Sequence, residues 1–210
     1  MTVSTSQSAG NELSRRALLR GSGFATAGMA VTEVASRLVG HAHAAQDGMQ
    51  FVGPDAASIA LNINGVARTL QVEPRMTLAE ALRGPLGLTG VKIACNRGAC
   101  SACTVWLDGA PICSCMMLAI EVGTRSVTTI EGLASGETLH PVQAAFIEHD
   151  AIQCGFCTPG MAMSCAALLE RVSDPTVADV QEAISGHLCR CGTYPHVVAA
   201  TLAAAKARKA

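Results

Sequence analysis

Residues 94–115 read ACNRGACSACTVWLDGAPICSC, a stretch that holds five of the chain's ten cysteines. A chain of 210 residues can bury a core without covalent cross-links, so these cysteines need a specific explanation. Four explanations are open: disulfide bonds, a zinc site, an iron-sulfur cluster, or burial as small apolar residues. The spacing of the cysteines and the residues around them help to choose among the four.

Four of these cysteines have the spacing found in plant-type ferredoxins, where they hold a 2Fe-2S cluster. Cys95, Cys100 and Cys103 follow C-x4-C-x2-C, and Cys115 comes after a predicted hairpin. Gly98 and its small neighbours allow a loop to wrap closely around an inorganic core and to direct amide N–H groups at its sulfurs. A zinc site usually has two short ligand pairs, which this spacing fits poorly. Spacing does not exclude disulfides, although a bridge between cysteines three residues apart would close too short a loop to stabilise the chain much.

A second set of four cysteines lies further along the chain, as Cys154-x2-Cys157 and Cys189-x-Cys191. A single C-x2-C pair could be redox-active or bind zinc, so alone it is a weak signal. Both pairs precede predicted helix starts, where unpaired N–H groups and the helix dipole favour a negatively charged cluster. We interpret the two pairs as ligands of one further metal centre.

The region around the first set has the pattern of a small sheet crossed by one helix. Alternating apolar residues between turn signals predict two hairpins, and a threonine followed three residues later by glutamate predicts a capped helix. The expected elements are a hairpin over 59–72 that turns at Asn64-Gly65, a short helix that Thr77 and Glu80 cap, a strand over 103–108, and its return strand over 110–114 after Asp108-Gly109.

From about residue 140 the sequence becomes helical and rich in alanine, which suits closely packed helices. Apolar residues at helical spacing, with proline in the first turns, predict successive helices. Cys165 falls on the apolar face of one of them and is expected to be buried. The expected helix starts are Thr158 with Pro159, Asp174 with Pro175, and Pro195 for a last helix that runs to about Ala207.

Three motifs carry a resemblance to a known family: NRGACSACTVWLDG, QCGFCTPGM and HLCRCGTYP. Over roughly residues 55–205 the chain resembles the small iron-sulfur subunit or domain of molybdenum hydroxylases, the xanthine oxidase and aldehyde oxidoreductase family. The resemblance implies an α+β fold with one 2Fe-2S cluster in each of two domains. These are, after a linker over 46–54, an N-terminal β-grasp plant-type ferredoxin domain over 55–130 and an all-α four-helix bundle domain over 131–207.

The resemblance also implies ligands, partners and a route for electrons. Substrate would be hydroxylated at a molybdopterin cofactor on a separate large subunit. Electrons would then leave through the cluster of the helical domain and the ferredoxin cluster, towards FAD on a medium subunit or another acceptor. Gln153 and Cys191 are expected to lie nearest the pterin. The implied cluster ligands are Cys95, Cys100, Cys103, Cys115, Cys154, Cys157, Cys189 and Cys191.

Two residues depart from the family pattern. Ser101 stands where glycine usually follows the second cysteine of the first set, so a positive φ there would be strained. Cys113 lies two residues before Cys115 and would share its face if the strand is regular, so it competes for the fourth ligand position. The family spacing favours Cys115, and Cys113 is then expected to be a small buried residue.

Residues 1–45 resemble a twin-arginine export signal. Arg15-Arg16 precedes a modestly apolar stretch, and Ala42-His43-Ala44 offers a signal-peptidase site. Glu33 and Arg37 interrupt that stretch, which leaves it too short to span a bilayer. Export of a folded protein would let clusters be inserted in the cytoplasm, and the expected assembly is a periplasmic aldehyde oxidoreductase.

The charge and the residue types of the chain argue against several other functions. A net charge of −1 with scattered basic residues gives no electrostatic footprint for nucleic acid. His140, His149, His187 and His196 lack a metal-ligand spacing, and no catalytic group is expected on this chain. Two alternatives stay open: a free-standing exported ferredoxin-like carrier, and a secreted module held by disulfides, which would contain no iron.

Overall fold

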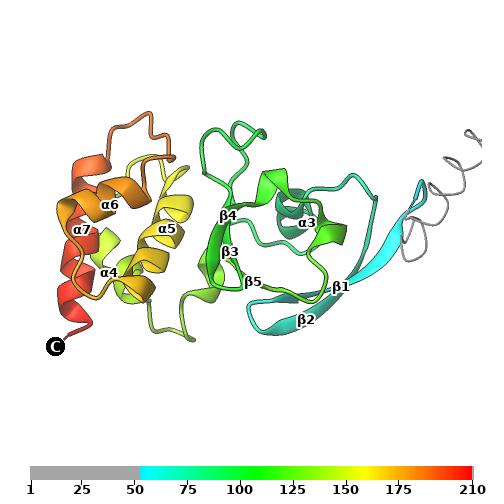
Figure 1. The fold of residues 1–210 in the computed structure, drawn as a ribbon, viewed down its shortest axis with the longest axis horizontal. Coiled ribbons are helices and arrows are strands. Elements are labelled where there is room, and N and C mark those ends of the chain that lie inside the picture. The colour runs from blue at the N-terminus through cyan, green and yellow to red at the C-terminus, as the bar shows by residue number, and fades with distance from the viewer. Residues whose placement is uncertain (1–52, 210) are drawn as a thin grey trace, which may run out of the picture. The chain divides into compact units, whose positions relative to one another are not determined.

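The computed structural model describes residues 53–209, which form a mixed β-sheet followed by several helices (Figure 1). The predicted export signal over 1–45 and most of the predicted linker lie outside the described residues. The α+β class expected from the sequence is confirmed for the part of the chain that is described. None of the helices found there has the length and apolar character needed to cross a membrane.

Five strands form one sheet in the order β2-β1-β5-β3-β4. β1 and β5 pair in parallel, and every other neighbouring pair is antiparallel. The strand bounds are β1 Ala57–Ile63, β2 Val66–Val72, β3 Thr104–Leu107, β4 Ala110–Cys113 and β5 Ser126–Thr128. We call residues 57–128 the sheet part.

Both predicted hairpins are confirmed, and each turns through two residues of positive φ. Asn64 and Gly65 have φ of 52° and 78°, and Asp108 and Gly109 have φ of 49° and 80°. Two left-handed residues give the type of two-residue turn whose twist matches that of the flanking strands. The return strand of the second hairpin is one residue shorter than expected and ends at Cys113.

The predicted short helix is α3, Leu78–Arg83, and its capping box is confirmed. The Thr77 hydroxyl accepts the Glu80 N–H at 3.2 Å, while the Glu80 carboxylate accepts the Thr77 N–H at 2.9 Å. α3 buries Leu78 and Leu82 completely in the apolar core under the sheet. Three single-turn 3-10 helices complete the connections: η1 Ser114–Met116, η2 Ala119–Glu121 and η3 Ile130–Gly132.

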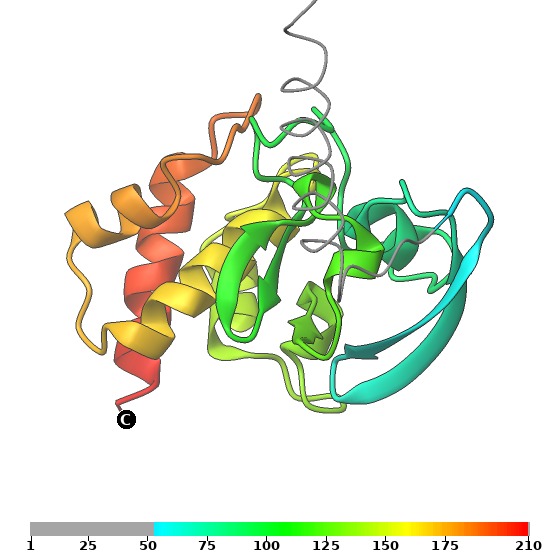
Figure 2. The ribbon, with the colours of Figure 1, turned by 45° about the vertical axis from the view of Figure 1, so that its right-hand side comes forward.

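Four α-helices make up the helical part, residues 141–207 (Figure 2). α4 and α5 both pack against α7, and α6 packs against α5 and α7. Their common core contains Phe146, Met161, Cys165 and Val197 together with many buried alanines, whose small size lets the helices approach closely. The helices are α4 Pro141–Glu148, α5 Thr158–Arg171, α6 Val177–Ala183 and α7 Tyr194–Ala207.

Two predicted helix starts were wrong in position. α5 has Cys157 as its N-cap, so Thr158 is its first helical residue and not the cap. α6 begins after Thr176 and not at Asp174 with Pro175. Thr176 is the N-cap of α6 because it forms a complete capping box with Asp179, whose carboxylate accepts the Thr176 N–H at 2.7 Å.

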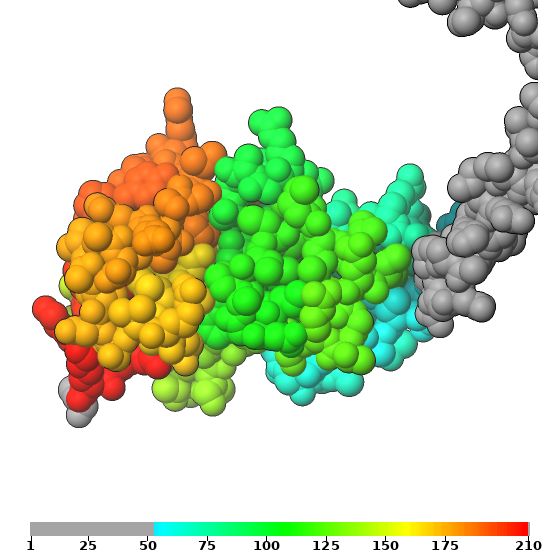
Figure 3. Space-filling view, in the orientation of Figure 1, coloured from blue at the N-terminus to red at the C-terminus, as the bar shows by residue number. Residues whose placement is uncertain are grey.

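α5 is buried on all sides and not on one face only. Every residue from 160 to 169 is buried, because the helix lies between β3 of the sheet part and the other helices. The Trp106 indole N–H on β3 donates to the Met163 carbonyl at 2.9 Å. The residues of the helical part therefore adjoin those of the sheet part directly (Figure 3).

Candidate metal centres

The first cysteine set, Cys95, Cys100, Cys103 and Cys115, begins in the loop between α3 and β3. Cys95 and Cys100 are neighbours, and the Ala99 N–H donates to Cys95 Sγ at 3.3 Å. Gly98, directly before Ala99, has a φ of 71°, a conformation that glycine adopts without strain. Hydrogen bonds, first from the Arg97 backbone and then from Cys100, lower the pKa of Cys95 to about 7.

The other half of the first set is buried. Cys103 contacts Cys115 across the base of the second hairpin, and burial, with further contributions from Cys115, raises the pKa of the Cys103 thiol to about 12. Ser114 fixes this contact, because its hydroxyl donates to the Cys103 carbonyl at 2.6 Å and its own N–H donates there at 3.3 Å. Sequence reasoning missed Ser114, since nothing in the motif marks the serine between two cysteines as fully buried.

Cys113 and Cys115 were expected to share a face if the strand were regular, and that condition is not met. The strand ends at Cys113, and Cys115 lies in the following 3-10 turn, η1. Cys113 is half-buried, and its Sγ lies 3.7 Å from the Ser101 hydroxyl. The structure thus brings Cys115 to Cys103 and places Cys113 beside Ser101, and Cys113 also lies near enough to Cys103 to help raise the pKa of its thiol.

Ser101 has the positive φ that was expected to be strained if this position required it. Its φ is 54°, in the left-handed region that favours glycine. Its carbonyl accepts from both the Thr104 hydroxyl, at 2.7 Å, and the Thr104 N–H, at 3.2 Å. These two hydrogen bonds hold the turn between Cys100 and Cys103 in place.

The second cysteine set comprises Cys154, Cys157, Cys189 and Cys191, and it also meets as two pairs. Cys157 contacts Cys189, and Cys154 contacts Cys191. Cys157 is the N-cap of α5, and Cys191 lies just before α7, so both predicted positions at helix entrances are confirmed. Cys154 is exposed, and Gln153 beside it is exposed too, so the Cys154–Cys191 contact brings the two residues expected near a pterin into one region.

The thiols of the second set differ strongly in acidity. Burial raises the pKa of Cys157 to about 12, and its contact with Cys189 adds to the increase. At Cys189 burial acts in the same direction, but hydrogen bonds from Thr193 and Cys157 outweigh it and lower the pKa to about 7. The Thr193 hydroxyl lies 3.3 Å from Cys189 Sγ.

Tyr194, the first residue of α7, anchors the loop that carries Cys189. Its hydroxyl accepts the Cys189 N–H at 2.8 Å and donates to the His187 carbonyl at 2.9 Å. Sequence analysis missed this role, although the contacts are local, because nothing in the motif marks the tyrosine hydroxyl as a partner of the Cys189 backbone. His187 is itself buried, its Nε2 lies 2.7 Å from the Ser164 hydroxyl, and burial lowers its pKa to about 4.

The other histidines have local structural contacts. Nδ1 of His140 accepts the Val142 N–H at the start of α4, at 3.2 Å. Nδ1 of His196 lies 3.0 Å from the His149 carbonyl.

The pairing of the thiols fits binuclear clusters better than single metal ions. The cysteines of each set lie as two neighbouring pairs. A 2Fe-2S cluster takes four cysteine thiolates, two on each iron, and this arrangement suits such a cluster. All ten cysteines are free thiols. The donor atoms, their pairing and the amide directed at Cys95 are suited to the cluster.

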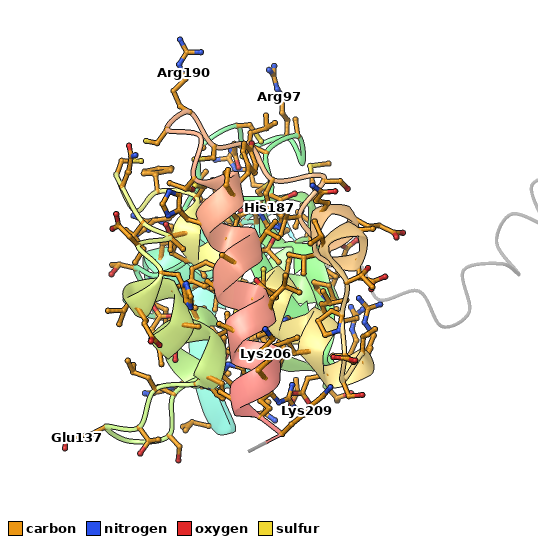
Figure 4. The ribbon with its side chains drawn as sticks, turned by 90° about the vertical axis from the view of Figure 1, so that its left-hand side faces the viewer. Arg97, Glu137, His187, Arg190, Lys206 and Lys209 are labelled. Atoms are coloured by element: carbon orange, nitrogen blue, oxygen red, sulfur yellow. The ribbon has the colours of Figure 1, made fainter. Side chains whose placement is uncertain are left out.

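The two sets are joined by a backbone hydrogen bond. The Leu188 N–H, next to Cys189, donates to the Cys100 carbonyl at 3.2 Å. Arg97 and Arg190, one from each cysteine-bearing loop, project from the same end of the molecule (Figure 4). The loops that carry the two sets therefore lie side by side.

Comparison with known families and proteins agrees with this geometry. A model described as a 2Fe-2S iron-sulfur cluster binding domain matches residues 61–125, and one described as a [2Fe-2S] binding domain matches residues 129–202. The nicotine 6-hydroxylase small subunit of Paenarthrobacter nicotinovorans is 47% identical over 148 residues, which cover 70% of this chain and 89% of the relative. The aldehyde oxidoreductase iron-sulfur-binding subunit PaoA of Escherichia coli (strain K12) is 38% identical over 203 residues, 90% of this chain and 86% of the relative.

Solved structures give the same result. Quinoline 2-oxidoreductase from Pseudomonas putida 86 superposes with a TM-score of 0.71 at 44% identity, over 74% of this chain and 97% of that chain. The aldehyde oxidoreductase of Desulfovibrio gigas superposes with a TM-score of 0.69 at 38% identity, over 73% of this chain but only 17% of that longer chain. The chain described here belongs to the family of small iron-sulfur subunits of molybdenum hydroxylases.

Proposed function

We propose that this chain carries electrons from a molybdopterin-containing large subunit, through two 2Fe-2S clusters, to FAD on a medium subunit or to another acceptor. The observation that carries the proposal is that eight cysteines meet as four thiol pairs, two in each set. A 2Fe-2S cluster supplies a one-electron carrier whose potential depends on its hydrogen bonds and its exposure. In this proposal the sheet part is a β-grasp domain and the helical part a four-helix bundle.

The protein would supply the thiolate ligands of both clusters, hydrogen-bond donors that stabilise their negative charge, and a fixed distance between the two clusters. Cys95, Cys100, Cys103 and Cys115 would hold one cluster, and Cys154, Cys157, Cys189 and Cys191 the other. The Ala99 N–H stabilises negative charge on Cys95, and the N-terminal ends of α5 and α7 favour negative charge near the second set. The hydrogen bond between Leu188 and Cys100 gives a short connection between the two sets.

The exposure of the two sets supports the order of the electron route. Beside the second set, Phe156 and Leu188 expose 46% and 61% of their surface, and Cys154 is open to solvent. Exposed apolar side chains around a thiol suit contact with a partner protein. We therefore assign the second set, with Gln153 and Cys191, to the side that faces the molybdopterin. Beside the more buried first set Met116 exposes 64% of its surface, which suits a second partner.

We assign aldehyde oxidation as the reaction of the assembly, with hydroxylation of a nitrogen heterocycle as the second candidate. The similarity to PaoA supports the aldehyde, because it extends over 90% of this chain. The similarity to the nicotine 6-hydroxylase small subunit supports the heterocycle. Turnover of the purified complex with aldehydes and with heterocycles distinguishes the two reactions.

Iron, sulfide and subunit analysis tests the proposed function. Protein matured in the cytoplasm should contain about four irons and four acid-labile sulfides per chain, since each 2Fe-2S cluster has two of each. It should purify with a molybdenum-containing subunit. Stoichiometric zinc without sulfide would overturn the cluster assignment, and full clusters without a molybdenum partner would identify a free-standing carrier.

We further propose export to the periplasm in folded form by the twin-arginine route. The support is Arg15-Arg16 and the apolar stretch that follows it. Replacing both arginines with lysine keeps the charge and should retain the protein, with any partner that lacks its own signal, in the cytoplasm. Unchanged periplasmic activity in that variant would contradict the proposed route.

A further inference from the structure

Gly160 is a buried glycine in the first turn of α5, and its backbone conformation does not require glycine. Its φ is not positive, and it lies within a regular helix, where alanine is the better helix former. It comes three residues after Cys157 of the second set. The absence of a side chain at position 160 must therefore be explained by the atoms that lie close to its backbone.

Gly160 lies against the loop of the first cysteine set. A Cβ at this position would lie 2.4 Å from the Ser101 carbonyl oxygen and 3.2 Å from the Ala102 carbonyl oxygen. Both atoms belong to the backbone between Cys100 and Cys103, so they cannot rotate away. Ordinary contact would require α5 and this loop to separate by about 1 Å.

The hydrogen bond between the two sets depends on the same approach. The Cys100 carbonyl, one residue before Ser101, accepts the Leu188 N–H at 3.2 Å. That distance is already at the long end of the range for such bonds. A separation of about 1 Å between α5 and the loop would therefore weaken or break the connection.

We propose that Gly160 is a positioning residue that holds the two cysteine loops in contact and so sets the rate of electron transfer between the two centres. The inference rests on the proposed function. The step moves one electron from the centre of the second set, which is oxidised, to the centre of the first set, which is reduced. It forms and breaks no bond and needs no proton.

The structure also offers a milder variant of the same contact. A Cβ at Gly186, which precedes His187, would lie 3.3 Å from the Ser101 hydroxyl and would meet no other atom within 4 Å. A hydroxyl can rotate, and Ser101→Gly removes it. Gly186→Ala should therefore have a small effect that Ser101→Gly relieves, whereas Ser101→Gly leaves the backbone carbonyl against position 160.

The test compares the cluster-loaded full chain with its Gly160→Ala variant. Iron and sulfide content and the separate paramagnetic resonance signals of the reduced centres should stay as in the wild type. The magnetic interaction between the two centres should fall, the Leu188 amide should exchange its hydrogen several-fold faster, and inter-centre electron transfer in the purified complex should slow several-fold. Wild-type magnetic interaction together with wild-type Leu188 exchange would overturn the inference.

Controls separate this inference from the proposed function. A wild-type chain that lacks clusters contradicts the proposed function, whereas a loaded Gly160→Ala chain with unchanged inter-centre properties contradicts only the role of Gly160. If Gly160→Ala does not fold, the Gly186→Ala variant is used to test the close approach instead. A reduced magnetic interaction that Ser101→Gly restores supports the close approach, and no change in Gly186→Ala overturns it.

Discussion

The first cysteine set is built mainly by one loop, whereas the second is assembled by the packing of helices. Cys95, Cys100 and Cys103 belong to a single loop, and Cys115 is brought to them by a hairpin that local turn residues determine. In the second set, the Cys154–Cys157 pair and the Cys189–Cys191 pair come from two helix entrances. The second set therefore depends on the relative placement of α5 and α7.

The two sets also differ in what anchors them. The hydroxyl of Ser114, a residue adjacent to Cys115, holds the backbone of Cys103. Tyr194 of α7 holds the backbone of Cys189. The first set is anchored within the sheet part, whereas the second is anchored at the start of α7 and also needs α5 and α7 to stay packed together. We expect the second centre to be the more easily lost of the two.

Replacing one ligand of each set should have the largest effect. Cys115→Ser and Cys189→Ser each exchange a soft thiolate for a harder oxygen ligand, so each variant should lose one centre and about half of the iron. Paramagnetic resonance of the reduced protein should show that the signal lost with Cys115→Ser is the one kept with Cys189→Ser. Loss of the same signal in both variants would contradict two separate centres.

Removing the anchors tests the difference between the sets directly. Tyr194→Phe leaves the Cys189 N–H and the His187 carbonyl without their partner, which should cost about 1–3 kcal/mol in that loop. Ser114→Ala should cost less, about 0.5–1.5 kcal/mol, because the Ser114 N–H still donates to the Cys103 carbonyl. Thermal release of iron should occur at a lower temperature in Tyr194→Phe, with the second signal lost first. If both variants release iron at the same temperature, the two sets do not differ in how firmly they are anchored.

The cap of α4 should make the helical part sensitive to acid. Neutral His140 accepts the Val142 N–H, and burial, followed by the nearby Arg208, lowers the pKa of His140 below its ordinary 6.5. As the pH falls below 6.5 the unfolded chain takes up the proton first, so this contribution to stability is present above pH 6.5 and is lost as the pH falls towards the folded pKa. In contrast, α3 is capped by the Thr77 hydroxyl, which does not titrate in this range.

His140→Asn is the matched control for the acid effect. Asparagine is a good N-cap and does not titrate, so the variant should unfold near the wild-type temperature at pH 8. Between pH 8 and pH 5 its unfolding temperature should fall less than that of the wild type. Parallel curves for the two proteins would show that His140 contributes nothing to the acid sensitivity.

Local signals in the sequence predicted most of the sheet part. Asn64-Gly65 and Asp108-Gly109 are strong local signals for two-residue turns, and the Thr77 capping box is complete within four residues. The motif also identified Ser101 as the position where a positive φ would be strained, and the structure shows a φ of 54° there. Strand β5 was missed, because Ser126–Thr128 has only three residues and is defined by its pairing with β1 and β3.

The features that were missed in the candidate site were missed for different reasons. The motifs identified all eight cysteines, and the structure brings them together as two sets of two pairs, while their role as ligands stays a prediction. The Leu188–Cys100 hydrogen bond could not be predicted, because it joins residues that lie far apart in the chain. The Tyr194 contact is local, but the motif contains no signal for it. The all-round burial of α5 likewise has no periodic signal in the sequence.

The smallest effect is expected at Cys113, the fifth cysteine of the opening motif. Its Sγ lies 3.7 Å from the Ser101 hydroxyl, so a serine at this half-buried position has a hydrogen-bonding partner within reach. Cys113→Ser should keep both centres and change the free energy of unfolding by no more than about 0.5 kcal/mol. The measurements are iron content, both resonance signals and denaturant unfolding, in parallel with Cys115→Ser. If Cys113→Ser removes the first signal and Cys115→Ser spares it, the fourth ligand has been assigned to the wrong cysteine, because the end of β4 must then turn differently from the structure.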